Sequence, residues 1–578
     1  MAVKSECRRL LVAAMDFGTT YSGYAFSFTT EPMKVQTNQA WVAGSRQLIS
    51  LKTPTCILLN VKKEFHSFGY EAENKYADLA MDGEHTNWYF FRHFKMILHN
   101  TEGLKQDTEI EDVLGHRIPA IEIFTWSIKY LKDHLMDTIQ NRIPGIVQED
   151  VHFVLTVPAI WDDKAKQYMR DAAVKAGISN DQLSLALEPE AAAVWCQQLE
   201  SLKTSESGSS STERLFMPGM KYMVVDLGGG TVDIAVHEIK QDRSLGELYK
   251  ASGGPWGGTY VDKNFLTFIG KIVGQDVLQE CAKKHMSDYI ELLREFETKK
   301  RTIKSVMDTK ITITLPIVIK EIFEEKGRDV KKAIAHSGNE GKITWDRDKL
   351  RFDGSLGLAF FDGPIQSTID HVSMLLSDPS LNNLSIILLV GGFAECELVR
   401  ETFKKTFKQK TIIIPEESGF VILKGATLSG HIPRAITTRR ARFTYGIAAL
   451  RPFDPAVHPR EQMVSRDGVC YCNNLFDKYV EIGETLNVNH AVTKNSVPSS
   501  IYDDELIYKM YASTKTSPIF TTDSSCRLLG TFVVPVPEGK TRNDKKIERS
   551  MMFGDTEIVF KVIHINTKKE FRTYFKYD

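Results

Sequence analysis

Two short segments of the chain combine an aspartate, glycines and threonines in the same order, each directly after an apolar run. The first is Asp16-Phe-Gly-Thr-Thr-Tyr21 and the second is Asp226-Leu-Gly-Gly-Gly-Thr-Val-Asp233. Glycines let backbone N–H groups approach phosphate oxygens, and threonine hydroxyls add further donors. Aspartates at strand ends can hold Mg²⁺, mostly through water molecules. The pair of segments therefore predicts a triphosphate site with a metal ion.

One such string alone is equally well explained as a tight turn between two strands. Two strings in tandem, each between apolar runs, indicate a duplicated lobe whose two turns clamp a triphosphate. Neither string is a Walker A loop, because GxxxxGK[ST] is absent, and neither is a GxGxxG dinucleotide turn. A different class of phosphate-binding fold has to position them.

Bulk composition excludes several other classes of protein. The 578 residues carry a net charge of −1, with 42% hydrophobic and 25% charged residues, which is ordinary for a globular protein. Nothing global points to nucleic acid or to an anionic membrane, and no run approaches the roughly 20 apolar residues of a membrane span. Eight cysteines without a regular framework indicate reduced thiols. We expect a cytoplasmic protein, with a nuclear location as the alternative suggested by Arg439-Arg440-Ala-Arg442.

Up to about residue 432, predicted strands and helices alternate as in an α/β protein. The expected strands are Val151–Val157, Tyr222–Asp226 and Ile386–Val390, and the expected helices are Trp161–Ala176, Glu190–Leu199 and Asp288–Ser305. Polar, serine-rich Ser201–Thr212 is expected to be a surface loop.

From residue 433 to residue 578 the pattern becomes β-rich, which predicts a separate, smaller all-β domain without a helical lid. The expected strands are Phe443–Ala449, Lys478–Ile482, Glu505–Ala512, Leu528–Val536, Glu557–Asn566 and Glu570–Lys576. The basic segment Pro433–Arg442 between the two parts is expected to be a solvated linker.

The order of these motifs resembles the seventy-kilodalton heat-shock chaperone family, within the superfamily that also contains actin and the sugar kinases. The resemblance continues through Thr156-Val-Pro158-Ala, Leu187-Glu188-Pro-Glu-Ala-Ala-Ala193, Glu297-Thr-Lys-Lys300-Arg301-Thr-Ile-Lys304 and Val390-Gly391-Gly392-Phe393. It implies an actin-like, two-lobed ATPase of duplicated ribonuclease-H-like lobes for residues 1–432. Within the family, the chain is most similar to the divergent heat shock 70 kDa protein 12 subgroup.

The resemblance also implies roles for individual residues. Asp16 and Asp226 would hold Mg²⁺. Catalysis would involve Lys95, Glu188, Thr231 and Asp233, and Pro158 would couple the nucleotide state to the rest of the chain. The phosphates of ATP or ADP would be bound by Gly18, Thr19, Thr20, Tyr21, Gly228, Gly229, Gly230 and Thr231. The adenosine would be bound by Glu297, Lys300, Arg301, Lys304, Gly391, Gly392 and Phe393.

The chain departs from the family pattern at the adenine turn, where Glu395 stands in place of an arginine. Phe393 is expected to stack on the adenine instead. The acidic, leucine-rich linker of the ordinary chaperones is also replaced, by the basic segment Pro433–Arg442. In the β-rich part, the segment Leu528–Pro537 resembles the peptide-binding domain of the chaperones.

Three functions follow from these observations. The first is an ATP-binding, chaperone-like protein that hydrolyses ATP slowly with Mg²⁺ and binds polypeptide clients in a stress response, without nucleic acid. The second is an adaptor or scaffold for signalling proteins, gated by the nucleotide and with little hydrolysis. The third, a sugar or metabolite kinase, is disfavoured because the last third of the chain is β-rich. The sequence names no co-chaperone.

Overall fold

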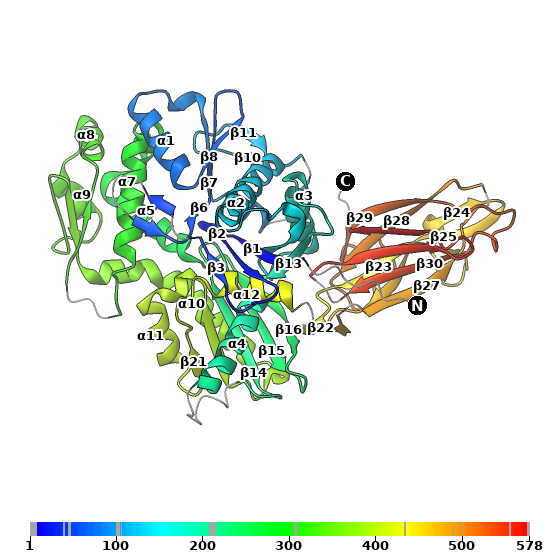
Figure 1. Cartoon of the computed structure of the whole chain (residues 1–578). Coiled ribbons are helices and arrows are strands. Elements are labelled where there is room, and N and C mark those ends of the chain that lie inside the picture. The colour runs from blue at the N-terminus through cyan, green and yellow to red at the C-terminus, as the bar shows by residue number, and fades with distance from the viewer. Residues whose placement is uncertain are drawn as a thin grey trace.

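Two central sheets with the same strand order form the larger part of the chain in its computed structural model (Figure 1). The first sheet has the order β13 (Leu183–Leu187), β12 (Val151–Val157), β1 (Leu11–Phe17), β2 (Tyr21–Phe28) and β3 (Gln36–Thr37), and β6 (Thr53–Pro54) also pairs with β2. The second contains β21 (Thr411–Ile413), β20 (Ile386–Val390), β14 (Lys221–Leu227), β15 (Val232–Ile239) and β16 (Leu245–Gly254) in this order. The structure describes residues 9–38, 41–43, 48–99, 104–105, 107–206, 216–305, 309–432, 435–488, 490–500, 502–553 and 556–574.

The two sheets are also equivalent in strand direction. β1 is parallel to β12 and antiparallel to β2, just as β14 is parallel to β20 and antiparallel to β15. Each glycine-rich segment is the turn between the antiparallel pair. The repeat agrees with the duplicated lobe expected from the two segments, and we call each sheet with the elements packed on it the first or second lobe.

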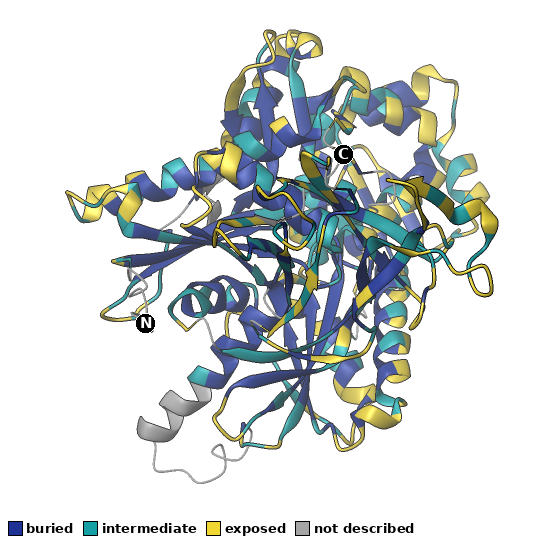
Figure 2. Cartoon of the chain, turned by 90° about the vertical axis from the view of Figure 1, so that its right-hand side faces the viewer, coloured by how far each residue is buried: buried dark blue, intermediate teal, exposed yellow. Residues whose placement is uncertain are grey.

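Helices cover the sheets and join the two lobes. Between the sheets lie α4 (Glu188–Glu206) and α12 (Val421–His431), whose buried residues share one apolar cluster with strands of both sheets. On the outer side of the first sheet lie α2 (Ala120–Arg142) and α3 (Asp163–Lys175), and the second sheet is covered by α5 (Gly258–Val273), α10 (Gly354–Leu376) and α11 (Glu397–Thr406). All seven residues of β1 are buried, as expected for a strand covered on both faces. Figure 2 shows the buried strands in dark blue, with exposed residues toward the outside.

Each lobe carries an outer extension, and the two extensions meet. The first consists of β7 (Cys56–Leu59), β8 (Phe65–Phe68), β9 (Tyr89–Arg92) and α1 (Tyr70–Met81). The second consists of α6 (Gln275–Lys284), α7 (Met286–Lys300), α8 (Ile317–Glu325), α9 (Val330–His336), β17 (Ile311–Thr314), β18 (Ile343–Asp346) and β19 (Lys349–Phe352). Met286 and Ile290 of α7 pack into an apolar cluster with Tyr76, Leu79 and Phe90 of the first extension. In the described residues, no helix is long and apolar enough to span a membrane.

Helix boundaries differ from the expectations at three places. Helix α3 begins at Asp163 because the Asp162 side chain accepts a hydrogen bond from the backbone N–H of Ala165 and caps the helix. Helix α7 ends at Lys300, earlier than the expected Ser305. Helix α4 extends through Glu206, so residues 201–206 are helical and the predicted loop was wrong there; the rest of that predicted loop, 207–212, lies outside the described residues.

Apart from β26 (Thr485–Asn487), which pairs within the second lobe's sheet, the strands after residue 441 form two further sheets, which we call the β domain (residues 441–574). One has the order β24 (Met463–Arg466), β25 (Val469–Val480), β23 (Thr444–Pro452), β28 (Glu505–Ser513) and β29 (Cys526–Pro535), and the other β27 (His490–Ser496), β30 (Ile547–Phe553), β31 (Val559–His564) and β32 (Glu570–Tyr574). Side chains from both sheets share one core, which includes Ile447, Met510, Met551 and Phe560. The described residues of this domain contain no α-helix. Figure 1 shows the domain beside the two lobes.

The basic segment before the β domain is not a solvated linker, and that expectation was wrong. Residues Ile436–Arg440 form β22, which pairs with β16 and extends the second sheet, and β26 (Thr485–Asn487) pairs with its other side. The physical reason is a set of contacts with residues distant in the sequence. Strand β22 supplies hydrogen-bond partners to the edge of β16, and the side chain of Arg439 forms an ion pair with the buried Glu190.

Candidate functional site

The two glycine-rich turns, which we call phosphate loop 1 (residues 16–21) and phosphate loop 2 (residues 226–233), face each other at close range. A Cβ atom on Gly229 would lie 2.2 Å from the Oγ1 atom of Thr20. A Cβ atom on Gly230 would lie 2.6 Å from both the Oγ1 atom of Thr19 and the Sδ atom of Met96. Glycine is therefore required at these positions by the approach of the opposite loop. The geometry brings together the backbone groups that the sequence predicted to surround the phosphates.

A buried lysine–glutamate pair lies beside the loops. Lys95, in the short helix η3 (Phe94–Leu98), has its Nζ atom 3.0 Å from Oε1 of Glu188, the first residue of α4. The same ammonium lies 5.0 Å from the centre of the Trp161 ring, whose face attracts cations. Burial raises the pKa of Glu188 to about 7, although Lys95 acts in the opposite direction. The pair thus places a cation and a proton acceptor together, both shielded from water.

Asp233 is held on both of its carboxylate oxygens. The Thr231 hydroxyl donates to Oδ2 at 2.9 Å, and the backbone N–H of Ile160 donates to Oδ1 at 2.9 Å. Burial raises the pKa of Asp233, and these two donors act against the rise. Because Ile160 follows Pro158 by two residues, the end of β12 is attached directly to phosphate loop 2.

The two aspartates predicted to hold Mg²⁺ have different surroundings. Asp16 accepts from the Thr156 hydroxyl at 2.8 Å and from Nζ of Lys52 at 2.6 Å. Burial raises the pKa of Asp16, but the opposing effect of Lys52, with smaller contributions from Lys95 and Thr156, leaves it below its usual value. Asp226 instead has a buried Oδ1 atom without a hydrogen-bond partner in the described structure. Burial, followed by the charge of Glu188, raises the pKa of Asp226 well above its usual value.

An unpaired buried carboxylate oxygen fits a bound cation. In the described residues, no three His, Cys, Asp or Glu side chains are arranged to hold a metal ion by themselves. Mg²⁺ does not need such a cluster, because it is usually bound by one or two carboxylates together with phosphates and waters. Asp226, with the charge of Asp16 nearby, therefore has the chemistry to hold Mg²⁺ beside a phosphate chain.

The charged residues at the end of α7 form an ion-pair network. Lys300 contacts Asp262 at 2.8 Å and also Glu297, and Arg301 contacts Glu297 at 2.7 Å. Lys304 is separate, with its Nζ atom 3.8 Å from Glu397, and both side chains are at least half exposed. The structure thus brings Glu297, Lys300 and Arg301 together and leaves Lys304 outside their network.

The turn predicted to bind adenine contains Phe393, and the stacking of this residue on adenine stays a prediction. Phe393 lies in the short helix η6 (Gly392–Glu395), and its ring packs 6.3 Å from that of Phe361 at an angle of 24°. Gly391 has φ +88°, and a Cβ atom there would lie 2.4 Å from Oδ1 of Asp226. A Cβ atom on Gly392 would meet no atom within 4 Å, so the backbone is open on that side.

Sequence reasoning missed three residues that line the site. Thr156 was in a recognised motif, but its bond to Asp16 was not predicted. Trp161 was named only as the start of a predicted helix, although its ring lies by Lys95. Lys52 had no motif of its own, and the only signal was its place before the strand-forming Thr53-Pro54.

The segment that follows the second lobe is attached by arginines to Glu190 of α4 and to the backbone of residues 159–161. Arg439 forms a bidentate ion pair with Glu190 at 2.6 and 2.8 Å. Arg442 donates to the backbone carbonyls of Ala159, Ile160 and Trp161 at 2.5–2.9 Å. These carbonyls belong to the stretch whose Ile160 N–H binds Asp233.

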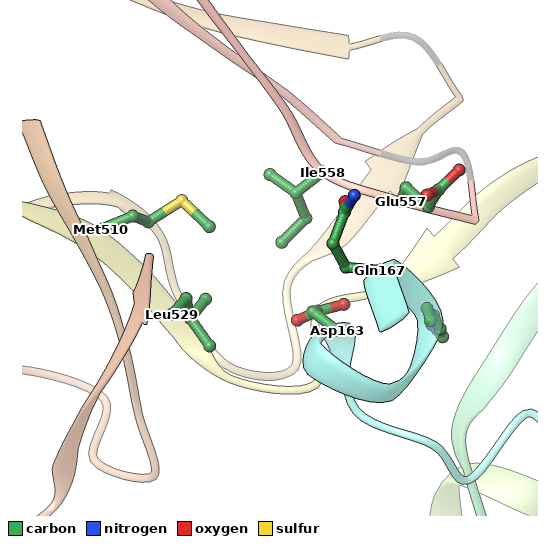
Figure 3. Close-up of a pocket in the computed structure, with 7 residues that line it drawn as sticks. Asp163, Gln167, Met510, Leu529, Glu557 and Ile558 are labelled. Carbon is green, nitrogen blue, oxygen red and sulfur yellow. The ribbon is translucent and has the colours of Figure 1, made fainter. Parts of the chain in front are cut away.

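The β domain contacts the first lobe through α3 and β13. Arg170 pairs with Glu557, with Nε 2.6 Å from Oε1, and the Thr556 hydroxyl donates to the carbonyl of Leu185 at 2.7 Å. A small pocket lies at this interface. Figure 3 shows Asp163 and Gln167 of α3 on one side of it and Met510, Leu529 and Ile558 of the β domain on the other.

Comparison with known proteins gives consistent results. Residues 101–440 match the family described as Hsp70 protein. Heat shock 70 kDa protein 12A of Mus musculus is 34% identical over 97% of this chain and 90% of its own length, and heat shock 70 kDa protein 12B of Homo sapiens is 31% identical with the same coverage. A chaperone protein HscA homolog of Acinetobacter baumannii is 27% identical over 55% of this chain and 42% of its own length.

Proposed function

Because the chain belongs to the Hsp70 family of ATP-binding proteins, we propose that it binds ATP with Mg²⁺ between phosphate loops 1 and 2 and hydrolyses the ATP slowly. The observation that carries this proposal is the buried Lys95–Glu188 pair beside the two facing loops. A buried cation at this position is suited to stabilise charge on a transferring phosphoryl group.

The side chains around the phosphate loops would have different roles in hydrolysis. Lys95 would face the end of the phosphate chain and balance its negative charge. Glu188, with a pKa of about 7, is able to hold the proton of an attacking water near neutral pH. Thr231 and Asp233 orient that water from phosphate loop 2. Asp226 and Asp16 would hold Mg²⁺, whose chemistry is to neutralise phosphate oxygens and orient the leaving group.

ATP turnover by the full chain tests this proposal against the adaptor alternative. We compare the wild type with Asp16→Ala and Thr231→Ala, and with Lys62→Ala as a control on an exposed lysine outside the cleft. Slow turnover by the wild type and Lys62→Ala, lost in the other two, supports hydrolysis. Wild-type turnover no faster than that of the two cleft variants leaves a nucleotide-gated adaptor. Transfer of phosphate to a small hydroxylated acceptor would favour a kinase.

We also propose that the nucleotide state is coupled to the β domain. The supporting contacts are continuous: Asp233 accepts from Ile160, and the carbonyl of Ile160 accepts from Arg442, where the β domain begins. A change in phosphate contacts at Thr231 and Asp233 would alter this chain of hydrogen bonds. Replacing Arg442 with Met should therefore make the hydrogen exchange of the β domain insensitive to ATP, without abolishing ATP binding. Unchanged sensitivity would contradict the coupling.

The β domain is proposed to bind polypeptide clients. Ile507 on β28 and Val533 on β29 are direct cross-strand neighbours and are 61% and 46% exposed. β29 is the outermost strand of its sheet, where an extended peptide could add main-chain hydrogen bonds. Binding of an unfolded, fluorescently labelled polypeptide should weaken in Ile507→Asp but not in Lys509→Asp, which lies on the same strand. Equal binding by all three proteins would argue against this surface.

A further inference from the structure

Lys52 reaches into the nucleotide cleft from a segment fixed against phosphate loop 1. It directly precedes β6, which pairs with β2, and the backbone N–H of Thr55 donates to the carbonyl of Thr20 at 2.8 Å. The stem of Lys52 passes over β2, since a Cβ atom on Gly23 would lie 3.1 Å from its Cγ atom. The position of the ammonium group is therefore set by the same strands that set the loop.

The ammonium group of Lys52 forms an ion pair with Asp16. Its Nζ atom is 2.6 Å from Oδ2 of Asp16, and the two side chains are 17% and 7% exposed. It also lies 5.5 Å from the centre of the Phe420 ring, which precedes α12. Lys52 thus stands between phosphate loop 1 and the segment beside the adenine turn, where Gly391 N–H donates to the carbonyl of Ser418.

The charged side chains around the phosphate loops suggest a function for Lys52. Four carboxylates, those of Asp16, Glu188, Asp226 and Asp233, influence one another electrostatically there. The cations that contact them are Lys95, on Glu188, and Lys52, on Asp16. A triphosphate would add several negative charges, and an ammonium group is a compact donor of three hydrogen bonds.

The geometry points to Lys52 as a second phosphate-binding residue, a cation built into the protein that supplies part of the charge neutralisation otherwise left to Mg²⁺. It would contact the phosphate chain of ATP from the side of phosphate loop 1. Lys95 would contact the phosphate chain from the side of Glu188. Asp226, whose Oδ1 atom is unpaired in the described structure, would hold the metal together with Asp16. This inference rests on the proposed binding of ATP in the cleft.

The inference predicts that ATP binding depends less on Mg²⁺ than it would without Lys52. We would titrate a non-hydrolysable ATP analogue and adenosine into the full chain, each with Mg²⁺ and with a chelator. The variants are Lys52→Met, which removes the charge at similar size, and Lys52→Arg, which keeps it. Lys62→Met is the matched control, because Lys62 is an exposed lysine of the same lobe.

In the presence of the chelator, Lys52→Met should bind the ATP analogue about tenfold more weakly than the wild type. A tenfold loss of affinity is the effect expected from losing one charge-assisted hydrogen bond. The loss should be smaller with saturating Mg²⁺ and absent for adenosine, which has no phosphates. Lys52→Arg and Lys62→Met should bind the analogue like the wild type in both conditions.

Four results would overturn the inference: unchanged affinity of Lys52→Met for the ATP analogue in the chelator, equal losses with and without Mg²⁺, a parallel loss of adenosine binding, or a loss in Lys52→Arg as large as in Lys52→Met. Should Lys52→Met fail to fold, Lys52→Gln takes its place with the same expected losses, because it also removes the charge and keeps a polar end. A wild-type chain that binds neither ligand would refute the proposed function itself. A wild type and a Lys52→Met variant that bind the ATP analogue equally well would refute only the role of Lys52.

Discussion

Arg170 on α3 and Glu557 in the β domain form a buried ion pair across the domain interface, with side chains only 3% and 11% exposed. Removing one partner leaves the other charge buried without compensation, which typically costs about 3–5 kcal/mol. We predict that Arg170→Met undocks the β domain and exposes the arginines of β22 to trypsin. Cleavage at Arg439–Arg442 should become at least about tenfold faster.

The exposed lysines of residues 404–408 provide an internal control, since they should be cut at the same rate in both proteins. Glu557→Gln should have a similar effect, and the double variant should lose less than the sum of the two. Unchanged protection of β22 in both single variants would show that the pair does not hold the domain in place.

The pH dependence of stability should reflect Glu247, a buried residue of β16 that accepts the backbone N–H of Arg440 at 2.8 Å. Burial, followed by the charge of Glu190, raises its pKa to about 7. A carboxyl whose pKa is higher in the folded chain contributes stability below its unfolded pKa, and the contribution is lost as the pH rises through about 7.

Glu247→Gln keeps an oxygen for Arg440 but cannot ionise. Its free energy of unfolding should exceed that of the wild type at pH 8, and the difference should be smaller at pH 5 by roughly 2 kcal/mol. Denaturant unfolding at the two pH values measures this, with the exposed Glu291→Gln as control. A wild type that is the more stable protein at pH 8 would contradict the assignment.

Lys95 should matter for hydrolysis much more than for binding. Lys95→Met removes the cation that faces the transferring phosphate, so single-turnover hydrolysis should slow by roughly 100-fold or more. ATP affinity should change only a few-fold, because the phosphate loops and Lys52 remain. Rapid-quench assays and equilibrium titration separate the two effects. A loss confined to affinity, with an unchanged rate at saturation, would remove Lys95 from the chemistry.

Glu73 bridges the two lobes, since it accepts from Arg92 of the first lobe at 3.2 Å and from Arg294 of the second at 2.8 Å. Glu73→Ala breaks this bridge between the lobes. Release of fluorescent ADP, followed by stopped flow, should become roughly tenfold faster. The exposed Glu71→Ala, on the same helix, is the control and should release ADP at the wild-type rate. Unaltered release from Glu73→Ala would show that the apolar contacts at Met286 and Ile290 suffice.

Local patterns predicted the parts of the structure that depend on neighbouring residues. An apolar run followed by an aspartate, glycines and threonines predicts a strand that ends in a tight turn. Both phosphate loops are turns at the predicted places. The strand Val151–Val157 has exactly the predicted limits, because apolar residues end there at a proline. Strand β25 begins well before the predicted Lys478, since its first half alternates too weakly to be recognised.

Long-range pairing accounts for what the sequence could not reveal. Arg439 looked like part of a solvated basic run because its partner, Glu190, lies on α4 and is 249 residues away in the sequence. Lys52 similarly meets Asp16 only through the pairing of β6 with β2. The position of Phe393 depends on Phe361 of α10, which no local pattern relates to the adenine turn. Such contacts are set by the tertiary fold and have no signature in a single segment.

ATP binding between the two loops is the central claim, and Gly229 tests it most directly. A Cβ atom at this position would lie 2.2 Å from the Oγ1 atom of Thr20, so a valine side chain would force the loops apart. Equilibrium titration of ATP with Mg²⁺ should give saturable binding at one site in the wild type and a loss of that binding in a folded Gly229→Val variant. Absence of saturable binding in the wild type, or equal affinity in the variant, would contradict the account.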